Sequence, residues 1–201
     1  MKKVFVLLGG FFLLLGTVFS QNYAAMAKKQ AKSMTKDGWI VNAGIKPLEV
    51  QFEKAYKMDD EVGQDGKKKY IHSSGEAIGS TYSAARLQAI AAAKTEIASS
   101  LESEIAGLIE SEIDNEELGQ EEAESVTSVV SNSKQLISKS LGRVDIVVEC
   151  YKQLSNKNYK VQVQLFYDLV QAERDAKKAV REELKKKGAN LNEKLEKLLG
   201  F

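Results

Sequence analysis

The chain has 201 residues, of which 28% carry charged side chains, and its formal net charge is +1 at pH 7. This balance argues against nucleic-acid binding, which usually needs a basic surface. One histidine and one cysteine are too few for the common transition-metal sites, so neither a metal nor another cofactor is expected.

The N-terminus has the order of an export signal. Two lysines precede an apolar run from Val4 to Phe19, as in the charged and apolar regions of a signal peptide. Residues 1–20 are the predicted signal, with cleavage between Ser20 and Gln21; a second small-x-small site ends at Ala27. The apolar run is shorter than the ~20 residues of a membrane span and no later stretch is long enough. We therefore expect Sec export to the periplasm, the envelope or the medium, with no transmembrane segment left after cleavage.

Cys150 is the only cysteine. A bacterial lipoprotein would need a cysteine directly after the apolar run, so a lipid anchor is not expected. A single cysteine cannot form an intramolecular disulfide. Its place in an apolar strand pattern predicts a buried small apolar residue, and a reactive or intermolecular thiol is the alternative.

The mature chain is divided into a flexible leader over residues 21–44 and a single α+β domain over 45–201. The leader is polar and alanine-rich without a sustained period. The domain core spans about 45–170, beginning with a helix over 47–58 whose first turn holds the only proline, Pro47. A loop over 59–69 and a strand over 70–78 follow.

The strongest periodicity belongs to a long alanine-rich helix from about Thr81 to Ile113. Apolar residues recur in it at the three-to-four-residue spacing of one helical stripe, and Ser80 or Thr81 can cap its start. A second helix is predicted over 121–141, ended by Gly142, so that the two helices form an αα-hairpin.

Two further strands are predicted over 144–151 and 159–167. The second alternates apolar and polar residues, and a polar turn over 155–158 joins the pair. We expect an antiparallel sheet of about three strands with one face buried by the long helix and the other largely solvated. C-terminal helices are expected over 169–199, the first ending near Gly188.

The segment GSTYSAARLQAIAAAKTEIASSL, from Gly79 to Leu101, combines a strand that ends in glycine with an alanine-rich helix containing a Gln-Ala pair. In this order of elements it resembles the exported small-lipoprotein family of the Lpp-twenty type, which is similar to the N-terminal domain of a periplasmic flagellar assembly protein. The resemblance covers about residues 45–170. It implies a compact α+β domain at the periplasm or envelope without established catalysis. The acylated cysteine of that family is missing here.

No catalytic constellation is recognisable, and no catalytic, cofactor-binding or metal-binding residue is assigned. His72 is the only histidine, and a solvated strand residue is the expected role. Gly75 and Gly79 match neither a P-loop nor a dinucleotide fingerprint, so they are interpreted as strand-end geometry. A hydrolase or metal-dependent enzyme would need Glu76, or acids of the 102–124 segment, to converge in a pocket.

Opposite charges concentrate in two helical segments. Ten acidic and no basic residues lie between Glu102 and Glu124, whereas residues 174–187 are rich in lysine and arginine. The acidic segment is a solvated hairpin tip or a docking surface, and the basic helix either contacts it or balances its own charge through i, i+4 pairs.

The leading hypothesis is an exported, non-enzymatic protein that works by binding an envelope partner or by self-assembly into a homo-oligomer. The alternatives are a carboxylate-based hydrolase or metal-dependent enzyme, and a structural accessory of a larger envelope complex.

Overall fold

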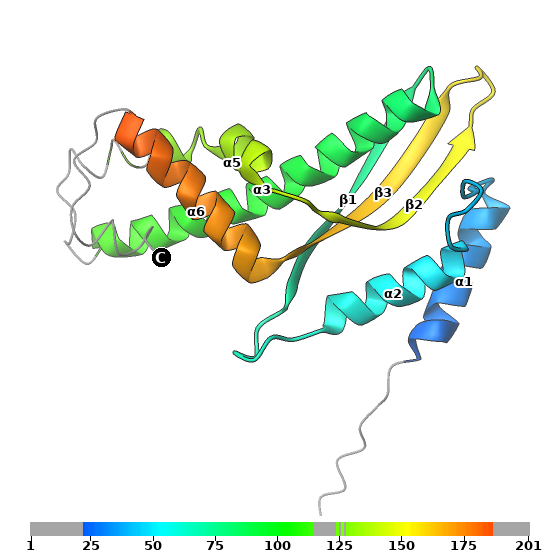
Figure 1. Ribbon diagram of the computed structural model, residues 1–201, viewed down its shortest axis with the longest axis horizontal. Coiled ribbons are helices and arrows are strands. Elements are labelled where there is room, and N and C mark those ends of the chain that lie inside the picture. Colours follow the sequence, from blue (N-terminus) through cyan, green and yellow to red (C-terminus); the bar gives the residue numbers. More distant parts are fainter. Residues whose placement is uncertain (1–21, 115–123, 125, 127, 187–201) are drawn as a thin grey trace, which may run out of the picture.

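The computed structural model describes residues 22–114, 124, 126 and 128–186 (Figure 1). The predicted signal peptide, the acidic tip between residues 115 and 123, and the short helix predicted after residue 187 lie outside these residues. Among the described residues, no helix combines the length and the apolar character needed to cross a membrane.

The centre of the fold is a three-stranded antiparallel sheet in the order β1-β3-β2. Its strands are β1 (Tyr70–Gly79), β2 (Asp145–Gln153) and β3 (Tyr159–Asp168). β2 and β3 form the predicted hairpin, and β1 pairs along the other side of β3. The predicted α+β class, with a small sheet against a long helix, is confirmed.

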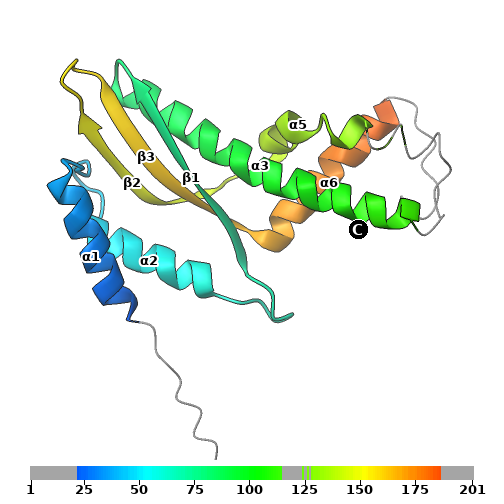
Figure 2. The ribbon, with the colours of Figure 1, turned by 180° about the vertical axis from the view of Figure 1, so that it is seen from behind.

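The long helix α3 (Tyr82–Asp114) covers one face of the sheet (Figures 1 and 2). Its start is capped as predicted, because the Thr81 hydroxyl accepts a hydrogen bond from the Ala84 amide at 3.1 Å. Ala85, Ala89 and Ala93 are buried against the strands. Small residues at this spacing let the helix backbone approach the sheet closely.

Gly75 and Gly79 complete that close approach from the β1 side. A Cβ atom on Gly75 would lie 2.0 Å from the carbonyl oxygen of Ala89, and one on Gly79 would lie 2.7 Å from the Ala85 amide nitrogen. Gly79 is the last residue of β1, but Gly75 is in the middle of the strand. The interpretation of Gly75 as strand-end geometry is therefore wrong; its role is helix–sheet packing.

The predicted flexible leader over 21–44 is also wrong. Residues Tyr23–Lys36 form helix α1, which the Asn22 side chain caps by accepting from the Ala25 amide at 3.0 Å. Ala27, Ala31 and Met34 are buried along one stripe. Small side chains make this stripe weakly hydrophobic, which is why its period is faint in the sequence.

Helices α1 and α2 (Leu48–Asp60) lie on the face of the sheet opposite α3 (Figure 2). A second apolar core forms there, in which Phe52, Val148, Cys150 and Phe166 are buried. The sheet is thus covered on both faces over β2, and the prediction of one largely solvated face is wrong for this half. Polar side chains remain on the same face towards β1, among them His72 and Gln164.

The helix predicted over 121–141 is interrupted within the described residues. A turn at Ser131–Asn132 precedes helix α5 (Lys134–Ser140). The buried Ser133 hydroxyl donates to the Val130 carbonyl at 2.7 Å, and the side-chain amide of Asn132 donates to the Ser128 carbonyl. Such side-chain bonds to the backbone compete with helical bonds, so the helix ends there.

Helix α6 (Leu169–Lys186) follows β3 directly and packs with α5 on the part of α3 beyond the sheet (Figure 1). Its apolar stripe of Ala172, Ala176, Val180 and Leu184 is buried. Tyr167 joins the two helices, because its hydroxyl donates to Asp175 at 2.5 Å and accepts from the Gly142 amide at 3.2 Å.

Candidate functional site

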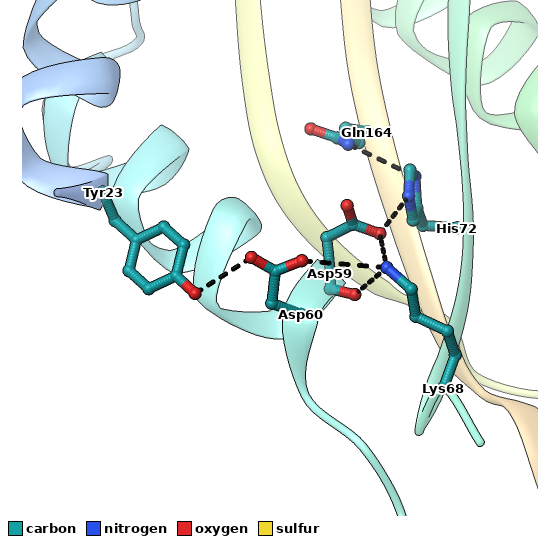
Figure 3. A network of polar contacts seen from close by, with 6 residues as sticks. All are labelled: Tyr23, Asp59, Asp60, Lys68, His72 and Gln164. Atoms are coloured by element: carbon teal, nitrogen blue, oxygen red, sulfur yellow. Dashed lines mark hydrogen bonds and ion pairs between the residues drawn. The ribbon is translucent and has the colours of Figure 1, made fainter. Parts of the chain in front are cut away.

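The first candidate site surrounds the only histidine (Figure 3). His72 lies on β1, and its Nε2 atom is 2.8 Å from Oδ1 of Asp59 at the end of α2. Lys68, in the loop before β1, contacts the same oxygen at 3.1 Å. Partial burial raises the pKa of Asp59, but the hydrogen bond from Lys68 and the charge of His72 outweigh it and hold that pKa below its usual value.

The network joins five parts of the chain: α1, α2, the loop before β1, β1 and β3. Tyr23 of α1 donates to Asp60 at 2.9 Å, and Gln164 of β3 is 3.4 Å from Nδ1 of His72 (Figure 3). Both ring nitrogens of His72 therefore have protein partners, and its ring stacks on Phe166 at a centroid distance of 4.8 Å. General base catalysis would need a ring nitrogen directed at a substrate or nucleophile. This arrangement instead connects α1 and α2 to the sheet.

The second candidate site is built on an ion pair between β2 and α3 whose carboxylate is nearly buried. The Glu149 side chain is 10% exposed and that of Arg86 is 34% exposed. Nε of Arg86 lies 2.8 Å from one carboxylate oxygen of Glu149 and Nη2 lies 3.0 Å from the other, so the pair is bidentate. The Tyr82 hydroxyl also donates to Glu149.

A β-bulge in β2 places Glu149 in this position. The register with β3 shifts between Ile146 and Val148, and Val147 and Val148 are both buried in the core on the α1 and α2 side. Strict alternation from Ile146 would turn Glu149 away from α3. The extra residue restores it to the face where Arg86 and Tyr82 lie.

The free edge of β2 is closed by two contacts. Gln51 of α2 accepts a hydrogen bond from the Glu149 amide at 2.7 Å, and Ile40 exchanges backbone hydrogen bonds with Tyr151. The same Gln51 side chain donates to the Lys46 carbonyl, so it fixes the turn before α2 against the strand. The Gln51 contacts hold α2 at the edge of β2, and the Ile40 bridge holds the segment before α2 at the same edge.

A groove of about 400 Å³ lies between α2, the edge of β2 and Arg86 of α3. Aliphatic side chains line part of it, namely Ile45, Val50, Ile146 and Val147. Lys46, Lys54 and Arg86 contribute three cations against the single carboxylate of Glu149. Ile45 and Val50 are 37% and 44% exposed, which is high for aliphatic residues in a folded domain. We take this groove as the candidate binding site.

The residues singled out from the sequence do not converge on a common site. Glu76 is on the surface and pairs with Lys160 at 2.6 Å, while Cys150 is buried in the second core. Of the acidic segment, Glu102, Glu104, Glu110, Glu112 and Asp114 lie on α3. In the described part of the chain, no group of three or more histidine, cysteine, aspartate or glutamate side chains is placed to hold a metal ion.

The described part of the basic helix lies close to α3. Burial raises the pKa of Glu104, the charge of Glu173 raises it further, and Lys177 of α6 acts in the opposite direction. Glu104 therefore lies near one negative charge and one positive charge of α6, those of Glu173 and Lys177. Lys186 contacts Glu183 at 3.8 Å within α6, as expected for a helix that balances part of its own charge.

Sequence reasoning did not identify Arg86, Gln51 or Glu149 as site residues. One signal was present: Glu149 is the only charged residue in the strand segment Ile146–Tyr151, and a carboxylate there requires a partner if the strand is buried. The identity of that partner depends on the bulge, which the alternation pattern does not show.

Comparisons with protein-family models, with curated proteins and with solved structures found no significant match. The resemblance to the exported small-lipoprotein family stays a prediction from the sequence.

The Cys150 thiol is expected to be unreactive in the native protein. Burial raises its pKa to about 12, so almost no thiolate is present near neutral pH. A chromogenic aromatic disulfide, which releases a coloured thiolate when it reacts with a free thiol, should give no colour within minutes when added to the folded chain. In denaturant the same reagent should titrate one thiol per chain. Rapid reaction of the folded protein would contradict the buried position.

Alkaline pH is expected to destabilise the fold. Burial and hydrogen bonds to Glu149 and Asp175 raise the pKa values of Tyr82 and Tyr167 from 10.0 to about 12. Because the pKa of each tyrosine is higher in the folded state than in the unfolded state, its protonated side chain contributes to folding stability. This contribution is complete below pH 10 and is lost as the pH rises towards 12. Urea unfolding across this range should show a falling midpoint, and Tyr82→Phe should flatten the fall.

Proposed function

We propose that this chain is an exported, non-enzymatic binding protein of the periplasm or envelope, and that the groove beside α2 is its binding surface. The groove is the observation that carries the proposal. Its volume of about 400 Å³ is within the ~300–1,000 Å³ of small-molecule sites. It combines aliphatic walls with a few fixed polar groups, as such sites do, and the residues beneath it are ion-paired rather than arranged around a nucleophile.

The start of the described fold supports the predicted cleavage between Ser20 and Gln21. Such a cut leaves Asn22, the capping residue of α1, in place. A cut after Ala27 would remove the cap and the first turn, together with a completely buried alanine that belongs to the second core. Processing at the first site therefore preserves the fold, and processing at the second would damage it.

Self-association or docking into a larger envelope complex is a second proposal, supported by the sheet. Within the described residues β1 pairs only with β3, so its outer edge has no neighbouring strand. Natural proteins usually cover or pair such edges. Size-exclusion chromatography with light scattering tests this proposal, and a monomer at all concentrations would count against self-association.

Export and binding are tested together on the full-length chain expressed in a Gram-negative host. Fractionation by osmotic shock and intact mass measurement should find a periplasmic protein that begins at Gln21. Native mass spectrometry of that material should reveal a bound small molecule that denaturation releases. Retention of the unprocessed chain in the cytoplasm would overturn the export proposal. Hydrolysis of model esters or peptides that Glu76→Gln abolishes would overturn the non-enzymatic one.

A further inference from the structure

We infer that the groove binds monomeric fatty carboxylates, that is, single-chain amphiphiles with an anionic head. The inference rests on the proposed binding function and names its ligand class. It is carried by three properties of the groove: the charge left after internal pairing, the position of the apolar side chains, and the size of the space.

The charge of the groove favours an anion. Both carboxylate oxygens of Glu149 are bonded by Arg86, and Tyr82 donates to one of them. That pair is electrically satisfied within the protein. Lys46 and Lys54 line the same groove. Among the described residues, neither lysine has an ion-pair partner. An incoming carboxylate would therefore meet two ammonium groups and no free negative charge.

The aliphatic side chains suit a hydrocarbon chain. Val50 and Lys54 are one turn apart on α2 and so share a face of the helix. Val50 and Ile45 contribute exposed apolar surface, and Ile146 and Val147 of β2 also line the groove. A ligand with a charged end and an apolar end can thus satisfy both parts of the groove at once. A small polar anion would leave the aliphatic walls in water.

The size of the groove favours a small ligand over a macromolecule. About 400 Å³ accommodates a single-chain molecule but not a folded domain. Binding should depend on chain length, since each methylene that the groove removes from water changes the dissociation constant by about fourfold.

Isothermal titration of the mature protein with decanoate, kept below its micelle-forming concentration, tests the inference. Decanoate should bind at least about tenfold more tightly than hexanoate and than uncharged decanol. Lys54→Met should weaken decanoate binding by about fivefold or more. Lys57→Met is the matched control, because Lys57 is one turn further along α2, pairs with Glu53 and does not line the groove. The Lys57→Met variant should bind decanoate with the affinity of the wild-type protein.

Several outcomes would overturn the inference. No heat of binding with decanoate, equal affinity for decanol, or equal losses from Lys54→Met and Lys57→Met would each exclude fatty carboxylates as the ligand class. Co-sedimentation with anionic phospholipid vesicles that Lys54→Met abolishes, without binding of free decanoate, would assign the groove to a membrane surface instead. Periplasmic processing with a different bound molecule would leave the proposed function standing, whereas cytoplasmic retention would remove it whatever decanoate does.

Discussion

Gly75→Ala is expected to destabilise the protein by about 3 kcal/mol or more, or to prevent folding. The added Cβ would lie 2.0 Å from the Ala89 carbonyl oxygen and 2.8 Å from the Ala93 amide nitrogen. Both atoms belong to the backbone of α3, so no side-chain rotation can relieve the overlap. Relief would require α3 to move away from β1, which would open the core formed by Ala85, Ala89 and Ala93.

Gly107→Ala is the matched control for this prediction. Gly107 also belongs to α3, but it is exposed and a Cβ atom there would meet nothing within 4 Å. Alanine there should stabilise the protein by about 0.5–1 kcal/mol through helix propensity. Urea unfolding of both variants gives the comparison. A Gly75→Ala variant as stable as wild type would mean that α3 does not pack as closely as described.

Local patterns predicted the elements whose side chains alternate or recur strongly. The ladder from Tyr159 to Tyr167 is visible as alternation and proved to be β3, and the stripe through Ile97 and Leu101 proved to be buried on α3. These signals arise because one face of each element is apolar. They report burial on a face without naming what covers it.

Tertiary contacts set the features that the sequence did not reveal. Helix α1 buries alanines, whose small apolar surface gives little periodic contrast. The second core exists because α1 and α2 cover the face of the sheet opposite α3. Val148 and Cys150 are buried there, but their apolar side chains would fit either face of the sheet, so the sequence does not show which one they occupy. The candidate groove depends on a one-residue bulge that pairs Glu149 with Arg86, 63 positions away in the chain. Alternation in a single strand carries no information about such a pair.

Arg86→Met is expected to cost about 2–4 kcal/mol, because it leaves a carboxylate that is only 10% exposed with one neutral donor, Tyr82. Glu149→Met should cost less, since Arg86 is 34% exposed and can turn its guanidinium towards water. Lys57→Met, which breaks a surface pair with Glu53, should change stability by no more than about 0.5 kcal/mol.

The double variant Arg86→Met/Glu149→Met separates a requirement for pairing from a requirement for charge. If the main cost of Arg86→Met is the unpaired buried carboxylate, removing that carboxylate as well should recover at least half of the lost free energy of unfolding. Urea unfolding of the four proteins gives the coupling energy. If the double variant recovers stability but binds decanoate more weakly than the wild type, the ion pair matters to the groove rather than to the fold. A double variant no more stable than Arg86→Met would mean that the hydrogen-bonded geometry around Tyr82 and Gln51, rather than charge neutralisation, holds β2 to the helices.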